Sequence, residues 1–251
     1  AKAEYQAFVE KNNSWLLPYA AFCVLRDMNG TPDFSKWKTN KKYNAKKITA
    51  FCEENRMEVD FWCFIQYHLD AQLSEVCSYA HSKGVVLKGD LPIGISRTSV
   101  DAWLYPELFH MDSQAGAPPD AFAEDGQNWG FPTYNWEKMA EDDYAWWKAR
   151  LRKMSEYFDA FRIDHILGFF RIWQIPLWSK SGLDGYFSPA LPYPAEELQN
   201  LGFNVEDKEL FIEDPHKPGY YHPKIGAMKT RAFSILDAYR RGSFERIYND
   251  F

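Results

Sequence analysis

Hydrophobic residues recur every three or four positions along much of the chain, which is the spacing of one face of an α-helix. This periodicity predicts helices over Ala3–Asp27 with a break near Pro18, Ile48–Arg56, Asp60–Gly84 and Asp142–Phe158. Asp60 is expected to cap the third of these helices, and Gly84 to end it in the left-handed conformation. The last helix is expected to bury a stripe made of Tyr144, Trp147, Leu151, Met154 and Phe158.

Two stretches have the pattern of β-strands. Val85–Leu87 is an unbroken apolar run, typical of a strand buried on both faces, and it leads to Asp90 just before Pro92. The second strand lies in Ala160–Gly168, where apolar and polar residues alternate. The order is therefore strand, long loop, helix, strand. That order is typical of a βαβ unit with parallel strands, and it places the chain in the α/β class.

The second strand carries the strongest candidate for chemistry. Alternation puts Arg162 and Asp164 on one face, while the apolar residues next to them face the other way. A fixed positive charge favours the ionised form of Asp164, and a carboxylate held in this way at the C-terminal end of a strand is suited to act as a nucleophile. A structural ion pair is the competing interpretation. Asp90 would bring a second carboxylate to the same edge.

The connection from Ile93 to Asn135 is unusually long, and loops of more than about 15 residues are mostly functional or disordered. Its many aromatic residues argue against disorder. Its second half, GAPPDAF followed by GQNWGFPTY, combines stiffening prolines and turn-forming glycines with aromatic and amide side chains. Flat apolar faces and amides suit a neutral, polyhydroxylated ligand such as a sugar. A loop packed on itself is the alternative, above all for Trp103 and Tyr105.

Composition narrows the class of partner. Aromatic residues make up 18% of the 251 residues, which fits either a large aromatic core or a surface that stacks on sugar rings. The formal net charge of −6 argues against nucleic acid. No apolar run is long enough for a membrane span, and no signal-peptide pattern is present, so a cytoplasmic location is expected. Reduced core residues rather than metal ligands are expected at Cys23, Cys52, Cys63 and Cys77.

Three groups of motifs, in this order and at this spacing, resemble those of one enzyme family. They are LKGDLPIG at 87–94, GAPPDAF with GQNWGFPTYNWE within 116–137, and YFDAFRIDHILGFFRIW at 157–173. Together they resemble the 4-alpha-glucanotransferases of glycoside hydrolase family 77, which are amylomaltases and disproportionating enzymes. The likeness covers residues 5–176 and, more weakly, the rest. These variants of the motifs are most similar to the plant cytosolic type and its bacterial relatives.

The resemblance implies a fold and a reaction. The fold would be part of a (β/α)₈ TIM barrel with helical subdomain insertions, and the site would lie at the C-terminal ends of the strands. The reaction would be the retaining transfer of α-1,4-linked glucosyl or glucan units among maltose, maltooligosaccharides and glycogen-like glucans, through a covalent glycosyl-enzyme. No metal, other cofactor, nucleic acid or membrane is implied.

The resemblance also assigns roles to individual residues. Asp164 would be the nucleophile, Arg162 would keep it ionised and oriented, and His165 would hydrogen-bond sugar hydroxyls. The other implied substrate-binding residues are Asp90, Gln127, Trp129 and Phe122. Asp90 would contact a glucosyl unit on the donor side. Gln127, Trp129 and Phe122 belong to the long loop and would line the cleft.

The chain departs from the family pattern in two residues and in its extent. Ala121 stands where the family usually has tyrosine, and Phe131 where it often has asparagine, so the grip on long glucans and the choice of acceptor are expected to differ. The family's general acid/base and transition-state stabiliser come from sequence that this chain does not contain. A retaining enzyme needs a second carboxyl about 5–5.5 Å from the nucleophile. With no initiator methionine either, we expect an inactive piece of a longer enzyme.

Three regions are expected along the chain. Residues 1–84 would form a helical subdomain with barrel helices. Residues 85–176 would supply barrel strands, and they include the substrate loop 93–135 and the nucleophile strand 160–166. Residues 177–251 would form an insertion with a helix and leave the barrel incomplete. Two other functions stay open at this point: a non-catalytic α-glucan-binding protein and an α-glucan hydrolase.

Overall fold

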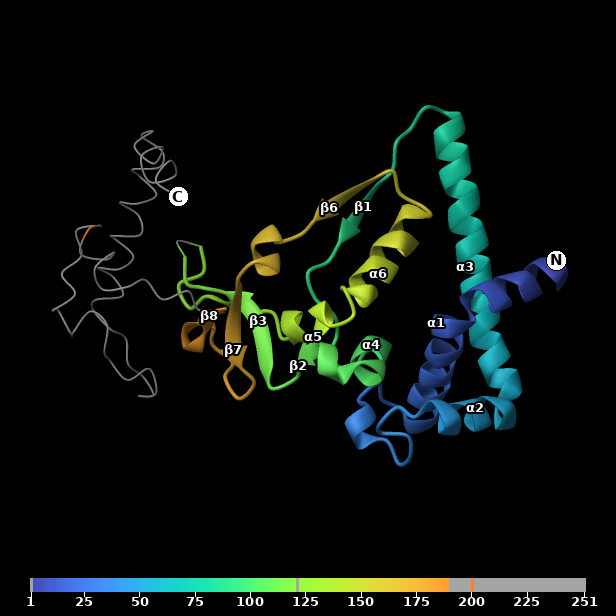
Figure 1. Cartoon of the computed structure of the whole chain (residues 1–251), viewed down its shortest axis with the longest axis horizontal. Coiled ribbons are helices and arrows are strands. Elements are labelled where there is room, and N and C mark those ends of the chain that lie inside the picture. Colours follow the sequence, from blue (N-terminus) through green and yellow to red (C-terminus); the bar gives the residue numbers. More distant parts are fainter. Residues whose placement is uncertain (1, 121, 190–199, 201–251) are drawn as a thin grey trace.

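The computed structural model describes residues 2–120, 122–189 and 200. Figure 1 shows long helices at one end of this part of the chain, a parallel strand pair with its helix beside them, and a small antiparallel sheet beyond. Ala121 and most of the third expected region lie outside the described residues, so the expected boundary at 177 stays a prediction.

Three helices form the first layer: α1 (Lys2–Asn29), α2 (Ala45–Glu54) and α3 (Arg56–Ser82). The expected break at Pro18 is wrong, because α1 runs through this buried proline. An internal proline costs roughly 3 kcal/mol, and burial of α1 against α3 on both sides of it offsets that cost. The expected cap at Asp60 is also wrong. Asn55 precedes α3 and Asp60 lies inside it, whereas Gly84 follows the helix in the left-handed conformation, as expected, with φ of +71°.

The helical layer has its own aromatic core. Trp37 and Trp103 are almost fully buried, and their rings meet edge to face at 5.7 Å. Trp103 belongs to the short helix α4 (Val100–Leu104), so the start of the long connection is anchored on the helical layer. Trp103 is therefore a core residue, but it packs on the helical layer and not on its own loop, so the self-packed alternative is wrong for it. All four cysteines are buried, in agreement with their expected place in the core.

The two expected parallel strands are present as β1 (Lys88–Leu91) and β6 (Ala160–Ile163). The expected buried strand at 85–87 is wrong, since Val85 and Val86 are exposed and β1 begins at Lys88, three residues after the expected start. Asp159 explains where pairing starts. Its backbone N–H donates to the carbonyl of Leu87 at 2.9 Å, and its carboxylate accepts the Leu87 N–H at 3.0 Å.

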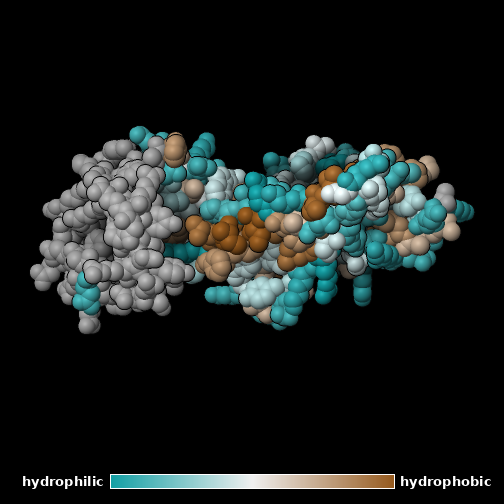
Figure 2. Space-filling view, turned by 90° about the horizontal axis from the view of Figure 1, so that it is seen from above, coloured by the Kyte–Doolittle hydropathy of each residue, from teal (hydrophilic) through white to brown (hydrophobic). Residues whose placement is uncertain are grey.

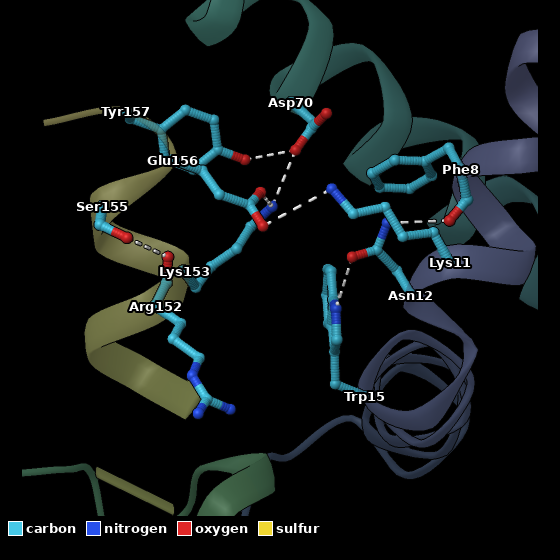
Figure 3. Close-up of polar contacts among 10 residues, drawn as sticks. All are labelled: Phe8, Lys11, Asn12, Trp15, Asp70, Arg152, Lys153, Ser155, Glu156 and Tyr157. Atoms are coloured by element: carbon cyan, nitrogen blue, oxygen red, sulfur yellow. Dashed lines mark hydrogen bonds and ion pairs between the residues drawn. The ribbon is translucent and has the colours of Figure 1, made fainter. Parts of the chain in front are cut away.

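Helix α6 (Ala145–Ser155) connects the substrate loop to β6. Trp147 of its expected stripe is buried, while Leu151 is exposed. Figure 3 shows how α6 and the turn after it are held to the helical layer. Asp70 of α3 accepts hydrogen bonds from Lys153, at 2.9 Å, and from the hydroxyl of Tyr157. These contacts fix the helix that leads into the candidate nucleophile strand.

The long connection is far more regular than expected. Its elements and those that follow β6 are η2 (Pro106–Leu108), β2 (Phe109–His110), β3 (Ser113–Ala117), β4 (Gln127–Asn128), β5 (Thr133–Tyr134), α5 (Trp136–Ala140), η3 (Ile166–Phe169), β7 (Ile172–Pro176), η4 (Gly182–Asp184) and β8 (Tyr186–Ser188). Strands β4, β3, β7 and β8 form one antiparallel sheet in that order, and β2 pairs with β5.

The result is a mixed fold of helices and sheets, in agreement with the expected class. A closed barrel is not present among the described residues, whose parallel pairing is that of β1 with β6. Within the same ranges, none of the helices combines the length and the apolar character that crossing a membrane requires.

Candidate functional site

A cleft of about 540 Å³ opens where β1 and β6 end. It is bounded by the residues after β1, by a turn of the long loop and by the residue that follows β6. These lining residues are Pro92, Ile93, Gly94, Ile95, Ser96, Arg97, Trp129, Gly130, Phe131 and Asp164. The candidate nucleophile and one wall residue expected from the sequence therefore share one cleft.

Asp164 is the first residue after β6, which is the position expected from the sequence. Its backbone N–H donates to the carbonyl of Leu91 in β1 at 3.2 Å, so the parallel pair fixes its main chain. Its side chain is exposed, and within the described part of the chain its carboxylate has no hydrogen-bond or ion-pair partner. It is thus an available oxygen nucleophile at the end of a strand.

Arg162 pairs with Asp90 rather than with Asp164. Its Nε and Nη2 donate to the two carboxylate oxygens of Asp90 at 2.7 and 2.6 Å, across a register in which these residues are direct neighbours. Hydrogen bonds from the guanidinium lower the pKa of Asp90, and the same contact raises the pKa of Arg162. The expectation that Arg162 orients Asp164 directly needs this correction: the bidentate partner is Asp90, and Asp164 acts on Arg162 only through its charge.

His165 turns the chain away from the strand in the left-handed conformation, with φ of 50°. Burial lowers the pKa of His165, and the charge of Asp164 acts in the opposite direction. The lowered pKa favours the neutral imidazole, in which one nitrogen donates and the other accepts a hydrogen bond. Its ring meets the indole of Trp129 edge to face at 4.9 Å.

The opposite wall is built from the second half of the long loop. The indole N–H of Trp129 donates to Oε1 of Gln127 at 3.0 Å, and its backbone N–H donates to the carbonyl of Ala115 in β3 at 2.9 Å. The Trp129 ring stacks on Phe131 at 5.7 Å. Phe131 lies so close to Gly94 that a Cβ there would come within 2.2 Å of the ring. Only glycine at that position allows this contact.

Of the expected site residues, Asp164 and Trp129 line the cleft, whereas Asp90, Arg162, His165, Gln127 and Phe122 do not. His165 and Gln127 each contact Trp129, while the side chain of Phe122 is 99% exposed. The sequence interpretation also missed Arg97, which lines the cleft and whose guanidinium donates to three backbone carbonyls of the long loop. A single arginine in a polar loop produces no periodic signal, so only the three-dimensional arrangement identifies it. No grouping of His, Cys, Asp and Glu able to hold a metal ion occurs among the described residues.

Comparison with known proteins gives a consistent set of relatives. A family model described as 4-alpha-glucanotransferase matches residues 1–214. A rice protein named 4-alpha-glucanotransferase DPE2 (Oryza sativa subsp. japonica) is 52% identical over 250 residues, which is 97% of this chain and 26% of that protein. A 4-alpha-glucanotransferase from Chlamydia caviae is 40% identical over 191 residues, covering 75% of this chain and 35% of that protein.

A solved structure shows a similar fold. The amylomaltase from Streptococcus agalactiae in complex with acarbose superposes with a TM-score of 0.69 at 28% identity, covering 90% of this chain and 46% of that one. The chain therefore spans between a quarter and a half of the length of these relatives.

Proposed function

Since the chain belongs to the 4-alpha-glucanotransferase family, we propose that it carries the nucleophile and one wall of an enzyme that passes α-1,4-linked glucosyl or glucan units between sugars. Maltose, maltooligosaccharides and glycogen-like glucans are the proposed donors and acceptors. The observation that carries this proposal is the exposed carboxylate of Asp164 in one cleft with the aromatic turn at Trp129.

The proposed reaction has two steps. An oxygen of Asp164 attacks the anomeric carbon of the donor, the glycosidic bond breaks, and the departing sugar hydroxyl takes a proton from a general acid. The resulting glycosyl ester is then attacked by the hydroxyl of a second sugar, which gives its proton to the same group and regenerates the carboxylate. Two displacements at one carbon retain the anomeric configuration.

The neighbouring residues have distinct proposed roles in this scheme. Asp90, held ionised by the two hydrogen bonds from Arg162, accepts hydrogen bonds from hydroxyls of the donor sugar. Neutral His165 hydrogen-bonds another hydroxyl, and the apolar face of Trp129 packs against a sugar ring. The side chain of Gln127 keeps the indole of Trp129 in place through its hydrogen bond. Phe122, which projects into solvent, has a role only with longer glucans.

The general acid/base is proposed to come from the rest of the protein, because the chain spans only 26% of its rice relative. For the same reason the isolated 251 residues are expected to show negligible turnover. The resemblance of the motifs to the plant cytosolic type supports a cytoplasmic location.

The test is incubation of maltotriose with the complete protein and, separately, with the 251-residue chain. The complete protein is expected to produce glucose together with glucans longer than maltotriose, and the chain alone to produce neither. Glucose without longer products would instead identify a hydrolase. Sugar binding without products from the complete protein would identify a non-catalytic α-glucan-binding protein.

A further inference from the structure

Arg97 holds together three separate points of the long loop. Its Nε donates to the carbonyl of Gly130 at 2.9 Å and its Nη1 to the carbonyl of Met111 at 2.8 Å. Its Nη2 donates to the carbonyl of Ser113 at the start of β3. Burial lowers the pKa of Arg97, and the nearby Asp112 acts in the opposite direction. A partly desolvated cation thus donates to three backbone acceptors of the loop.

The hydrogen bond from Arg97 to the carbonyl of Gly130 is the one that bears on the shape of the cleft. Gly130 has φ of +77°, and its N–H donates to Oδ1 of Asn128 at 2.9 Å, so the peptide group before its Cα is held by Asn128 and the one after it by Arg97. Its two neighbours in the chain are Trp129 and Phe131, the stacked aromatic pair of the wall. The position of Gly130 therefore determines how far the wall stands from Asp164.

The arrangement requires the shape of a guanidinium. Its planar fork presents several N–H groups in fixed directions and can meet three carbonyls at once. The single ammonium of a lysine is a compact point charge and does not reproduce this pattern. Removal of the guanidinium would leave partly buried carbonyls without donors, which strongly favours rearrangement of the loop.

We propose that Arg97 is a positioning residue of the glucan site, which sets the affinity for glucan by fixing the turn 129–131 against Asp164 and His165. This inference rests on the proposed function, since the ligand of the wall is taken to be a glucan. Arg97 itself takes no part in bond making, so its loss is expected to act on binding more than on chemistry.

The experiment compares Arg97→Gln and Arg97→Lys in the complete protein with Arg152→Gln, a control at an exposed arginine on α6 (Figure 3). The KM for maltotriose is expected to rise about tenfold in both Arg97 variants, the effect of losing one or two hydrogen bonds to a charged group, while kcat changes less than about threefold. Hydrogen–deuterium exchange without sugar is expected to become faster in 126–134 and to stay unchanged in β1 and β6.

Unchanged KM and exchange in the Arg97 variants would overturn the proposal. Faster exchange throughout the chain in Arg97→Lys as well as Arg97→Gln would also overturn it, because Arg97 would then be a general stability residue. A lower kcat at constant KM would contradict the assigned role in binding. If exchange is faster only in 126–134 but the complete wild-type protein transfers no glucan, the proposed function fails while the positioning role of Arg97 stands.

Discussion

The aromatic wall formed by Trp129 and Phe131 and the strand β6, which ends just before Asp164, meet at the same cleft but are built in opposite ways. Four of the five residues of β3, which supports the wall, are buried, and the strand has β4 on one side and β7 on the other. All four residues of β6 are exposed, and this strand pairs only with β1 among the described residues. Figure 2 shows hydrophobic residues gathered across the middle of the face seen from above.

This difference shows which part of the site is complete in itself. The wall obtains its hydrogen bonds and its packing from residues 93–135 and from β7, so its geometry is set locally. Strand β6 presents apolar side chains such as Phe161 and Ile163 to solvent, which a strand in a finished fold avoids. We therefore expect the remainder of the protein to complete the site on the side of β6, in keeping with the limited share of its relatives that the chain spans.

The largest expected effect is on chemistry at the nucleophile strand. In the complete protein, Asp164→Asn is expected to lower kcat for transfer by about 10⁴-fold or more, because the amide cannot form the glycosyl ester. Affinity for maltotriose, measured by calorimetry, should change less than about threefold, because Trp129 and the other wall residues remain. Transfer at a wild-type rate would show that the strand does not carry the nucleophile.

A matched pair of core substitutions tests the difference in packing. In the isolated chain, Ile175→Ala in β7, at a side chain with 0% exposure, is expected to cost about 2–5 kcal/mol, from lost burial and the cavity left behind. Ile163→Ala in β6, at 45% exposure, should cost no more than about 0.5 kcal/mol, as at other surface positions.

Urea denaturation of the two variants provides the measurement. In the complete protein the cost of Ile163→Ala is expected to rise toward that of Ile175→Ala, because the strand would there be covered. Equal costs in the isolated chain would contradict the contrast between the two regions. An Ile163→Ala cost that stays low in the complete protein would show that nothing further packs on β6.

Disruption of the ion pair between the two parallel strands should have an intermediate effect. Arg162→Gln is expected to lower kcat/KM about 10- to 100-fold, because Asp90 loses its two charged hydrogen bonds. The double variant with Asp90→Asn should be no worse than the more severe single variant, since both changes remove the same contact. Additive losses in steady-state kinetics would mean that Arg162 acts on Asp164 independently of Asp90.

The smallest expected effect concerns the contact that begins strand pairing. The N–H of Leu87 and then the ring of His81 lower the pKa of Asp159. A carboxyl with a lowered pKa stabilises the folded state above its unfolded pKa of about 4, and this contribution is lost as the pH falls through the folded value. Asp159→Asn should therefore lower the melting temperature at about pH 6, by an amount that shrinks toward about pH 3. A difference that grows on acidification would contradict this assignment.

The comparison also explains what could be predicted from the sequence. Helical periodicity located the long helices, and alternation located β6 and placed Asp164 correctly at its end. The apolar run at 85–87 indicated a strand but misplaced it, because β1 occupies Lys88–Leu91. The strands β2, β4 and β5 have two residues each, too few to show an alternating pattern, so the connection was expected to be irregular. A proline break at Pro18 was expected because local propensity says nothing about burial against another helix.

Contacts between residues far apart in the sequence could not be predicted either. Arg162 and Asp90 are 72 positions apart, and only the register of β1 against β6 makes them neighbours. From the sequence, the nearest carboxylate to Arg162 was Asp164. Arg97 was missed because its three partners are backbone carbonyls, which have no signature in the sequence.

The central claim is that the oxygen of Asp164 forms the covalent bond to the sugar, and trapping that bond tests it most directly. The complete protein would be treated with an activated glucosyl donor whose ester is hydrolysed slowly, digested, and analysed by peptide mass spectrometry. We predict one hexose-derived adduct on the peptide that contains residues 160–168, located at Asp164 by fragmentation. An adduct on Asp90 or on any residue other than Asp164, under conditions in which transfer proceeds, would contradict the account.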